Sequence, residues 1–245
     1  MDAGKLIGIR LVAALLALAG ATAVSAATYT ATVPINGGTD TLLLDSAQPY
    51  NKIWFGAGYD TPAYQALYSG YVPAHGGFFP ATTLTPTAGK VFAKKTVAIL
   101  GTGNYKFTVL QPGTTATQTT TYDLISALYV LPGTTEPFNS AALQSNLVAF
   151  SDDDTATYSR NPFPLHYINN TPGCVTATVL IFPWSTVANP VADFSVEGPG
   201  IIADTCEQAV QINSKAVPVS GPAGYAVLVS LLLGLGGLLL GRKRR

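Results

Sequence analysis

The sequence predicts an all-β fold, an antiparallel β-sandwich or jelly roll, flanked by an N-terminal signal helix and a C-terminal transmembrane helix. Between residues 28 and 213 the chain has short runs of β-branched and aromatic residues separated by turn-forming residues, a pattern typical of strands. No stretch in that range shows a convincing helical period. Long apolar runs at the two ends explain why 48% of the residues are hydrophobic and 11% are charged. The expected strands are 28–33, 41–44, 91–100, 105–110, 125–130, 147–150, 175–182 and 194–196.

Residues 1–26 have the layout of a secretory signal peptide. Lys5 and Arg10 precede an apolar stretch over 11–23, and small residues follow up to Ala26. This order of charge, apolar run and small residues is the signature of export. We therefore expect the Sec machinery to export the chain and signal peptidase to cleave it after Ala26. The alternative is a buried N-terminal helix, but the run lacks a capping pattern.

Residues 223–240 form an apolar run of 18 residues without a charge. In a helix such a run spans about 27 Å, enough to cross the core of a bilayer. The basic tail 241–245 is expected to remain cytoplasmic. Its cations are Arg242, Lys243, Arg244 and Arg245. The alternative, an apolar core helix, would place these four cations directly beside the core.

A candidate sorting motif precedes this run, within the predicted linker 214–222. The motif consists of Val217, Pro218, Val219, Ser220, Gly221 and Pro222. Motif, apolar helix and basic cluster together resemble the three-part sorting tails of the PEP-CTERM and IPTL-CTERM type, which occur in Gram-negative bacteria that secrete exopolysaccharide. The resemblance implies recognition by an exosortase, a membrane cysteine protease that removes the tail and passes the protein to the cell surface.

The exported part, residues 27–213, has the size of one domain. Its second half contains a series of strand and turn motifs in a familiar order. They are Gly103-Asn104-Tyr105-Lys106-Phe107, Tyr122-Asp123-Leu124, Asn146-Leu147, Asp152-Asp153-Asp154 and Gly198-Pro199-Gly200. On these motifs, residues 98–202 resemble the jelly-roll β-sandwich module related to bacterial pre-peptidase C-terminal domains, with 159–173 as an insertion.

The two cysteines, Cys174 and Cys206, are expected to form a disulfide, because an exported chain enters an oxidising compartment. Such a bond closes a loop of about 33 residues and stabilises the fold by roughly 3–4 kcal/mol. Free thiols or a catalytic cysteine are the alternatives. No family signature surrounds either cysteine, and the histidines His75 and His166 lie among Pro and Gly residues.

An acidic turn is the candidate metal site. Asp152, Asp153 and Asp154 follow a predicted strand, and Asp123 precedes the neighbouring one. Carboxylate and backbone oxygens are the ligands that Ca²⁺ prefers, so these four residues could bind Ca²⁺. The run lacks the spacing of an EF-hand loop, and a solvated acidic turn without a cofactor is the alternative.

Nine aromatic residues lie between residues 50 and 79. Aromatic rings stack on sugar rings, so Trp54, Tyr59 and Tyr64 are candidate contacts for extracellular polysaccharide. The alternative is that these rings pack in the core, as most aromatic residues do.

Catalysis and nucleic-acid binding find little support. The chain has no G-x-S-x-G, no H-E-x-x-H and no P-loop, so we expect no enzyme activity. Residues 27–213 carry six basic and twelve acidic side chains, which disfavours contact with phosphate. We expect a structural or adhesive protein, anchored in the inner membrane in transit and then sorted to the cell surface or the exopolysaccharide matrix. The alternatives are a Ca²⁺- or polysaccharide-binding module and a permanently anchored single-pass envelope protein.

Overall fold

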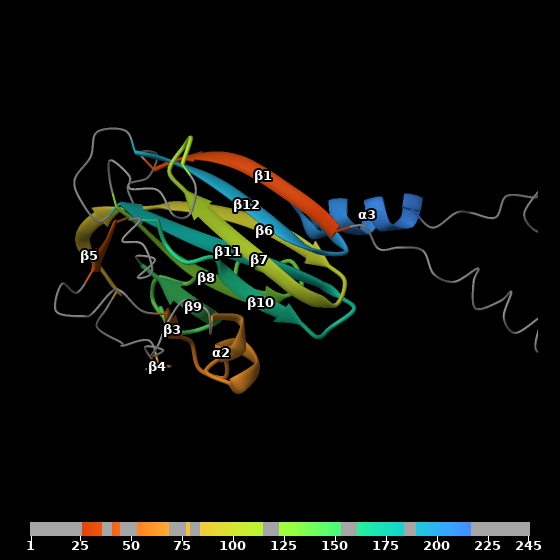
Figure 1. Cartoon of the computed structure of the whole chain (residues 1–245), viewed down its shortest axis with the longest axis horizontal. Helices are drawn as coiled ribbons and strands as arrows, with labels where there is room; N and C mark the ends of the chain where they lie inside the picture. Colours follow the sequence, from red (N-terminus) through yellow and green to blue (C-terminus); the bar gives the residue numbers. More distant parts are fainter. Residues whose placement is uncertain are drawn as a thin grey trace, which may run out of the picture.

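The chain folds into two β-sheets packed face to face, with two helices outside them, in the part that the computed structural model describes (Figure 1). The described residues are 26–35, 41–44, 53–68, 77–78, 84–114, 123–152, 161–183 and 190–216. Strands dominate this part, so the structure confirms the predicted β-sandwich.

The first sheet has four antiparallel strands. In spatial order they are β1 (Ala26–Pro34), β12 (Val191–Pro199), β7 (Gly103–Leu110) and β10 (Leu165–Asn169). Along β7, Tyr105, Phe107 and Val109 are buried and alternate with more exposed residues. This period of two is the one expected for a strand with one face on the core.

The second sheet has seven strands. In spatial order they are β13 (Ile201–Ala203), β6 (Ala93–Leu100), β11 (Cys174–Pro183), β8 (Leu124–Pro132), β9 (Leu147–Ser151), β3 (Ile53–Phe55) and β4 (Gly77–Phe78). All neighbours are antiparallel except β3 and β4. A separate pair joins β2 (Thr41–Leu44) to β5 (Leu84–Val91).

The main core lies between the two sheets. It combines residues such as Phe107 and Phe194 of the first sheet with Leu128 and Val179 of the second. A second cluster, which includes Phe150 and residues of β8 and β11, covers the other face of the seven-stranded sheet. Strands β8 and β11 are therefore buried on both faces, which explains why their sequences are almost continuously apolar.

The expectation of no helix between 28 and 213 is wrong. Helix α2 (Pro62–Tyr68) has seven residues, too few to show a clear period. Helix α3 (Cys206–Ala216) is capped by Thr205, whose Oγ1 accepts a hydrogen bond from Gln208 N at 3.2 Å. Only Cys206 and Ala209 of α3 are buried core residues, so its apolar face is narrow.

The predicted boundaries shift at several places. All eight expected strands overlap observed strands, but β3, β4, β10 and β13 were not expected, and β5 shares only Val91 with an expected strand. Strand β10 lies inside 159–173, the segment interpreted as an insertion, and is part of the first sheet. Helix α3 extends to Ala216, so the first residues of the predicted linker 214–222 are helical.

The sandwich has two ends, which we name by their contents. The disulfide end holds the turns β6–β7, β8–β9, β10–β11 and β12–β13 together with the start of α3. At the opposite end, β7, β9 and β11 end and β8, β10 and β12 begin. The described chain begins at Ala26 and ends with α3, both on the disulfide side (Figure 1).

Candidate functional site

The disulfide predicted from the sequence is confirmed. Cys174, the first residue of β11, is bonded to Cys206, the first residue of α3, with their Cα atoms 5.8 Å apart. The bond attaches α3 to a strand in the middle of the seven-stranded sheet. Beside it, Ala98, Ala203 and Ala209 form a small apolar cluster, so the start of the helix is held by packing as well as by the covalent bond.

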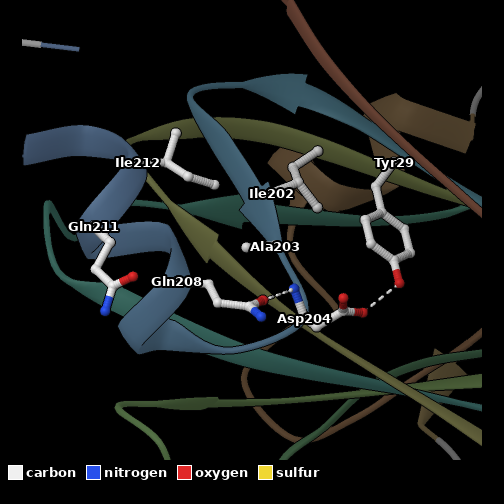
Figure 2. Close-up of a pocket in the computed structure, with 7 residues that line it drawn as sticks. All are labelled: Tyr29, Ile202, Ala203, Asp204, Gln208, Gln211 and Ile212. Carbon is white, nitrogen blue, oxygen red and sulfur yellow. Dashed lines mark hydrogen bonds between the residues drawn. The ribbon is translucent and has the colours of Figure 1, made fainter. Parts of the chain in front are cut away.

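An open groove of about 330 Å³ lies between α3, β13 and β1. Figure 2 shows its lining. The lining residues are Tyr29, Ile202, Ala203, Asp204, Gln208, Gln211 and Ile212. The hydroxyl of Tyr29 donates a hydrogen bond to Oδ1 of Asp204, and the Asp204 N–H donates one to Gln208 Oε1 at 3.2 Å. These bonds tie β1 to the segment that enters α3.

Lys95 of β6 completes the charge arrangement beside this groove. Its Nζ lies 3.3 Å from Asp204 Oδ1 and 4.9 Å from the centre of the Tyr29 ring. The hydrogen bond from Tyr29 is the largest cause of a lowered pKa at Asp204, and Lys95 acts in the same direction. Burial alone would lower the pKa of Lys95, but its bonds to Tyr29 and Asp204 raise it. At neutral pH the pair is therefore ionised, and its charges balance.

The sequence offered no signal for this arrangement. Tyr29 and Asp204 are 175 positions apart, and no motif contains either residue. Chemically, the groove combines apolar walls from Ile202 and Ile212 with a compensated ion pair. The groove lies between strands and a helix, and its charged lining residue, Asp204, forms an ion pair with Lys95 beside it.

The candidate Ca²⁺ ligands lie at the opposite end. Asp123 immediately precedes β8 and Asp152 immediately follows β9, and these strand ends are adjacent because Ser126 pairs with Ser151. Asp152 is only 5% exposed. Asp153 and Asp154 lie outside the described residues, and the described part contains no group of three or more His, Cys, Asp or Glu residues that could hold a metal ion. Ca²⁺ binding stays a prediction.

The candidate sugar-binding aromatics divide between two clusters. Tyr59 and Tyr64 stack edge to face with their ring centres 5.3 Å apart, on the main core. Trp54 packs on the second cluster instead. The structure thus brings together Tyr59 and Tyr64 but not Trp54, and polysaccharide binding stays a prediction.

Two tyrosines of α2 bind the edge of β10, a role that sequence reasoning missed. The N–H of His166 donates to Tyr68 Oη at 2.8 Å, and the N–H of Ile168 donates to Tyr64 Oη at 2.9 Å. Four residues along a helix span about 6 Å, and two residues along a strand span about 6.8 Å. The i, i+4 spacing of the tyrosines therefore matches the i, i+2 spacing of the outward N–H groups, and this spacing was the available signal.

The predicted targeting segments lie outside the described residues: 1–25, the motif 217–222, the apolar run 223–240 and the basic tail 241–245. Of the two helices in the described part, neither is long and apolar enough to cross a membrane. Helix α3 ends at Ala216, directly before the motif. No protein-family model matches the sequence, and comparison with curated proteins and with solved structures finds no match either.

Proposed function

We propose that this chain is an exported structural or adhesive protein of a Gram-negative cell surface or exopolysaccharide matrix, without chemistry of its own. The observation that carries the proposal is the disulfide between Cys174 and Cys206. Such bonds persist in oxidising, extracytoplasmic compartments. This one fixes to the sandwich the helix that leads directly into the predicted sorting tail.

The position of the chain ends supports attachment through one end of the domain. Ala26 pairs with Pro199 at the disulfide end, and α3 starts from the same end (Figure 1). The predicted signal peptide and the predicted anchor therefore both adjoin the disulfide end. In an anchored molecule the opposite end, with Asp123 and Asp152, is then the part farther from the membrane.

The disulfide also suits a protein that bears load. Force applied to the tail is transmitted to the domain through α3, and the disulfide at Cys206 transmits it to β11. That strand pairs with β6 over 174–181 and with β8 over 175–183. Force is thereby distributed over the middle of a sheet instead of peeling a terminal strand, as an adhesive or matrix component requires.

We further propose that the domain is a jelly roll. The four-stranded order β1-β12-β7-β10 and the order β6-β11-β8-β9 within the larger sheet match the interleaved strand order of an eight-stranded jelly roll. Residues 35–92 then form an insertion between its first two strands, while α3 is a C-terminal addition. This topology supports the resemblance to pre-peptidase C-terminal modules and makes 159–173 an integral part through β10.

Mass spectrometry of the mature protein, purified from the producing cells and their medium, tests this proposal. We expect an N-terminus at Ala27, a Cys174–Cys206 peptide pair, and a C-terminus between Val217 and Gly224. An intact Arg245 on a membrane-bound protein would support a permanent anchor instead of sorting. Retention of residues 1–26 together with free thiols would contradict export.

A second candidate function is Ca²⁺ binding at the opposite end. The nearly complete burial of Asp152, beside Asp123 at adjoining strand ends, favours it. Millimolar Ca²⁺, but not Mg²⁺, is expected to raise the melting temperature, because a ligand that binds only the folded state stabilises it. Asp152→Asn should abolish the shift, and Asp193→Asn, at a half-buried position in β12, should retain it. Equal curves with and without Ca²⁺ would exclude the site.

A further inference from the structure

Strand β1 differs from the other edges of the proposed jelly roll, because within the described residues no further strand pairs with its outer side. The β6 edge is extended by β13, and the β9 edge is extended by β3 and β4. The β10 edge is capped by the hydroxyls of Tyr64 and Tyr68. The added strands β13 and β4 have only three and two residues, and short edges resist further pairing.

The edge of β1 has none of the usual protections against pairing. It is nine residues long, contains no charged residue, and has its proline, Pro34, at the very end. Its register with β12 runs without a bulge. Soluble proteins normally interrupt such an edge with Lys, Pro or a bulge, so β1 is built to accept another strand (Figure 1).

The direction of the free backbone groups follows from one hydrogen bond. Ile35 N–H donates to Pro190 O at 2.8 Å, in continuation of the β1–β12 register. Residues of an antiparallel strand alternate in the side to which they direct their N–H and C=O groups. Thr28, Thr30 and Thr32 therefore direct both groups to the open edge, and their side chains are exposed.

We propose that β1 pairs antiparallel with β1 of a second copy of this chain, about a two-fold axis at Thr30. This register uses nearly the whole mature strand, because residues 27–33, which remain after cleavage after Ala26, have Thr30 as their midpoint. It places Thr30 opposite Thr30 and Thr28 opposite Thr32. The free backbone N–H and C=O groups of one copy then face those of the other and can form hydrogen bonds. Threonine pairs across strands are favourable, and no like charges face each other.

The side chains on the other face fit the same register. Tyr29 stands opposite Ala31 of the second copy, which sets a large side chain beside a small one. Cleavage after Ala26 leaves Thr28, Thr30 and Thr32 in place. Joining two copies makes one continuous eight-stranded sheet from two four-stranded ones.

The geometry assigns this pairing a role across two surfaces, a conclusion that rests on the proposed function. Antiparallel pairing turns the disulfide end of one copy towards the opposite end of the other. The two tails then leave at opposite ends of the pair, which suits molecules anchored in facing surfaces or linked within a matrix. One short pairing is weak, but many copies on one surface act together.

Register-specific cross-linking of the full chain tests the pairing. Directly opposite residues have Cβ atoms about 5 Å apart, whereas Thr28 of one copy lies about 14 Å along the strand from Thr28 of the other. With a thiol cross-linker of about 5 Å, Thr30→Cys should give a covalent dimer. A mixture of the Thr28→Cys and Thr32→Cys variants should also give a covalent dimer. Neither of these two variants should give one on its own. No dimer from Thr30→Cys, or equal dimer from Thr28→Cys alone, would overturn the proposal.

Vesicle clustering separates this inference from the proposed function. The full chain is reconstituted into vesicles of phosphatidylethanolamine and phosphatidylglycerol, and clustering is followed by light scattering. We expect clustering with the native chain and at least a tenfold loss with Thr30→Lys, which opposes two ammonium groups at the axis. Exposed Thr135→Lys is the matched control. Failure of the chain to float with the vesicles contradicts membrane anchoring, whereas flotation without clustering contradicts pairing between surfaces.

Discussion

The two ends of the sandwich are held by different kinds of contact. At the disulfide end, a covalent bond joins β11 to α3, and the Tyr105 hydroxyl lies within hydrogen-bonding range of the carbonyls of Gly101 and Pro199. At the opposite end the described residues include no disulfide, and hydrogen bonds of a buried asparagine join the turn after β7 to the segment before β10. Asn161 accepts a hydrogen bond from Gln111 N at 3.0 Å and donates one to Thr114 Oγ1 at 3.2 Å.

This contrast agrees with the proposed function, in which attachment and load are assigned to the end that has the covalent bond. The opposite end keeps buried polar residues, among them Asp152 and Asn161, and polar groups there can serve recognition. Substitutions at the two ends should therefore lower the stability by different amounts and for different physical reasons.

The largest effect is expected from Cys206→Ser. Loss of a disulfide that spans 32 positions should lower the free energy of unfolding by about 3–4 kcal/mol. Chemical denaturation of the native chain in reducing buffer is the control and should give the same loss. A change below about 0.5 kcal/mol in both would mean that the two ends do not differ as described.

Glycine-to-alanine substitutions at the two ends compare how much space each end leaves for an added Cβ. A Cβ added at Gly198, at the disulfide end, would overlap the ring of Tyr105, and we expect a loss of about 2–3 kcal/mol. Gly113, at the opposite end, has open space around it and a φ of 74°. Gly113→Ala should therefore cost only about 1 kcal/mol of backbone strain. Thermal melts of both variants measure the difference, and the reverse order would contradict the tighter packing of the disulfide end.

Two buried asparagines compare the ends by hydrogen bonding. Asn169 donates to Gly101 O at 2.7 Å at the disulfide end, and Asn161 is its counterpart at the opposite end. Each change to alanine should cost about 1–2 kcal/mol, because buried partners lose their hydrogen bonds. In the Cys206→Ser background, the loss of stability from Asn161→Ala should add fully to the loss from Cys206→Ser, whereas the loss from Asn169→Ala should not. Additivity at both positions would show that Asn169 is not coupled to the disulfide.

The smallest effect concerns His166, on the β10 edge between the ends. Burial lowers its pKa to about 4, and nearby Lys106 acts in the same direction. The ring also faces Tyr68 and Asn104. Because the folded pKa lies below the unfolded value of about 6.5, the unfolded chain binds the proton first, and stability falls as pH drops from 6.5 to 4.

The expected loss from His166 is about 1 kcal/mol, reduced from the full linkage value because the ring is partly exposed. Denaturation of the native chain and of His166→Gln at several pH values measures it. The variant should have a flatter profile over this range, and identical profiles would rule out a contribution from His166.

The sequence predicted what depends on local pattern or on compartment. Strands such as β7 and β11 follow from their period or their apolar run, and the cysteine pair follows from the predicted signal peptide. Strand β10 was not predicted, because Pro162 and Pro164 precede it within a segment interpreted as an insertion. The Tyr29–Asp204 bond and the caps from α2 to β10 join residues 98 to 175 positions apart. Such pairs arise only when the sheets assemble. The spacing of Tyr64 and Tyr68 is a local signal, but it does not identify β10 as their partner.

Labelling of intact cells tests the central claim, that the domain is exported to the surface with its opposite end outward. Pro112 is exposed in the turn after β7 at that end. Both native cysteines are in the disulfide, so Pro112→Cys supplies a single reactive thiol. A membrane-impermeant maleimide should label this variant as fully in intact cells and medium as after lysis. Labelling that appears only after lysis would contradict the account.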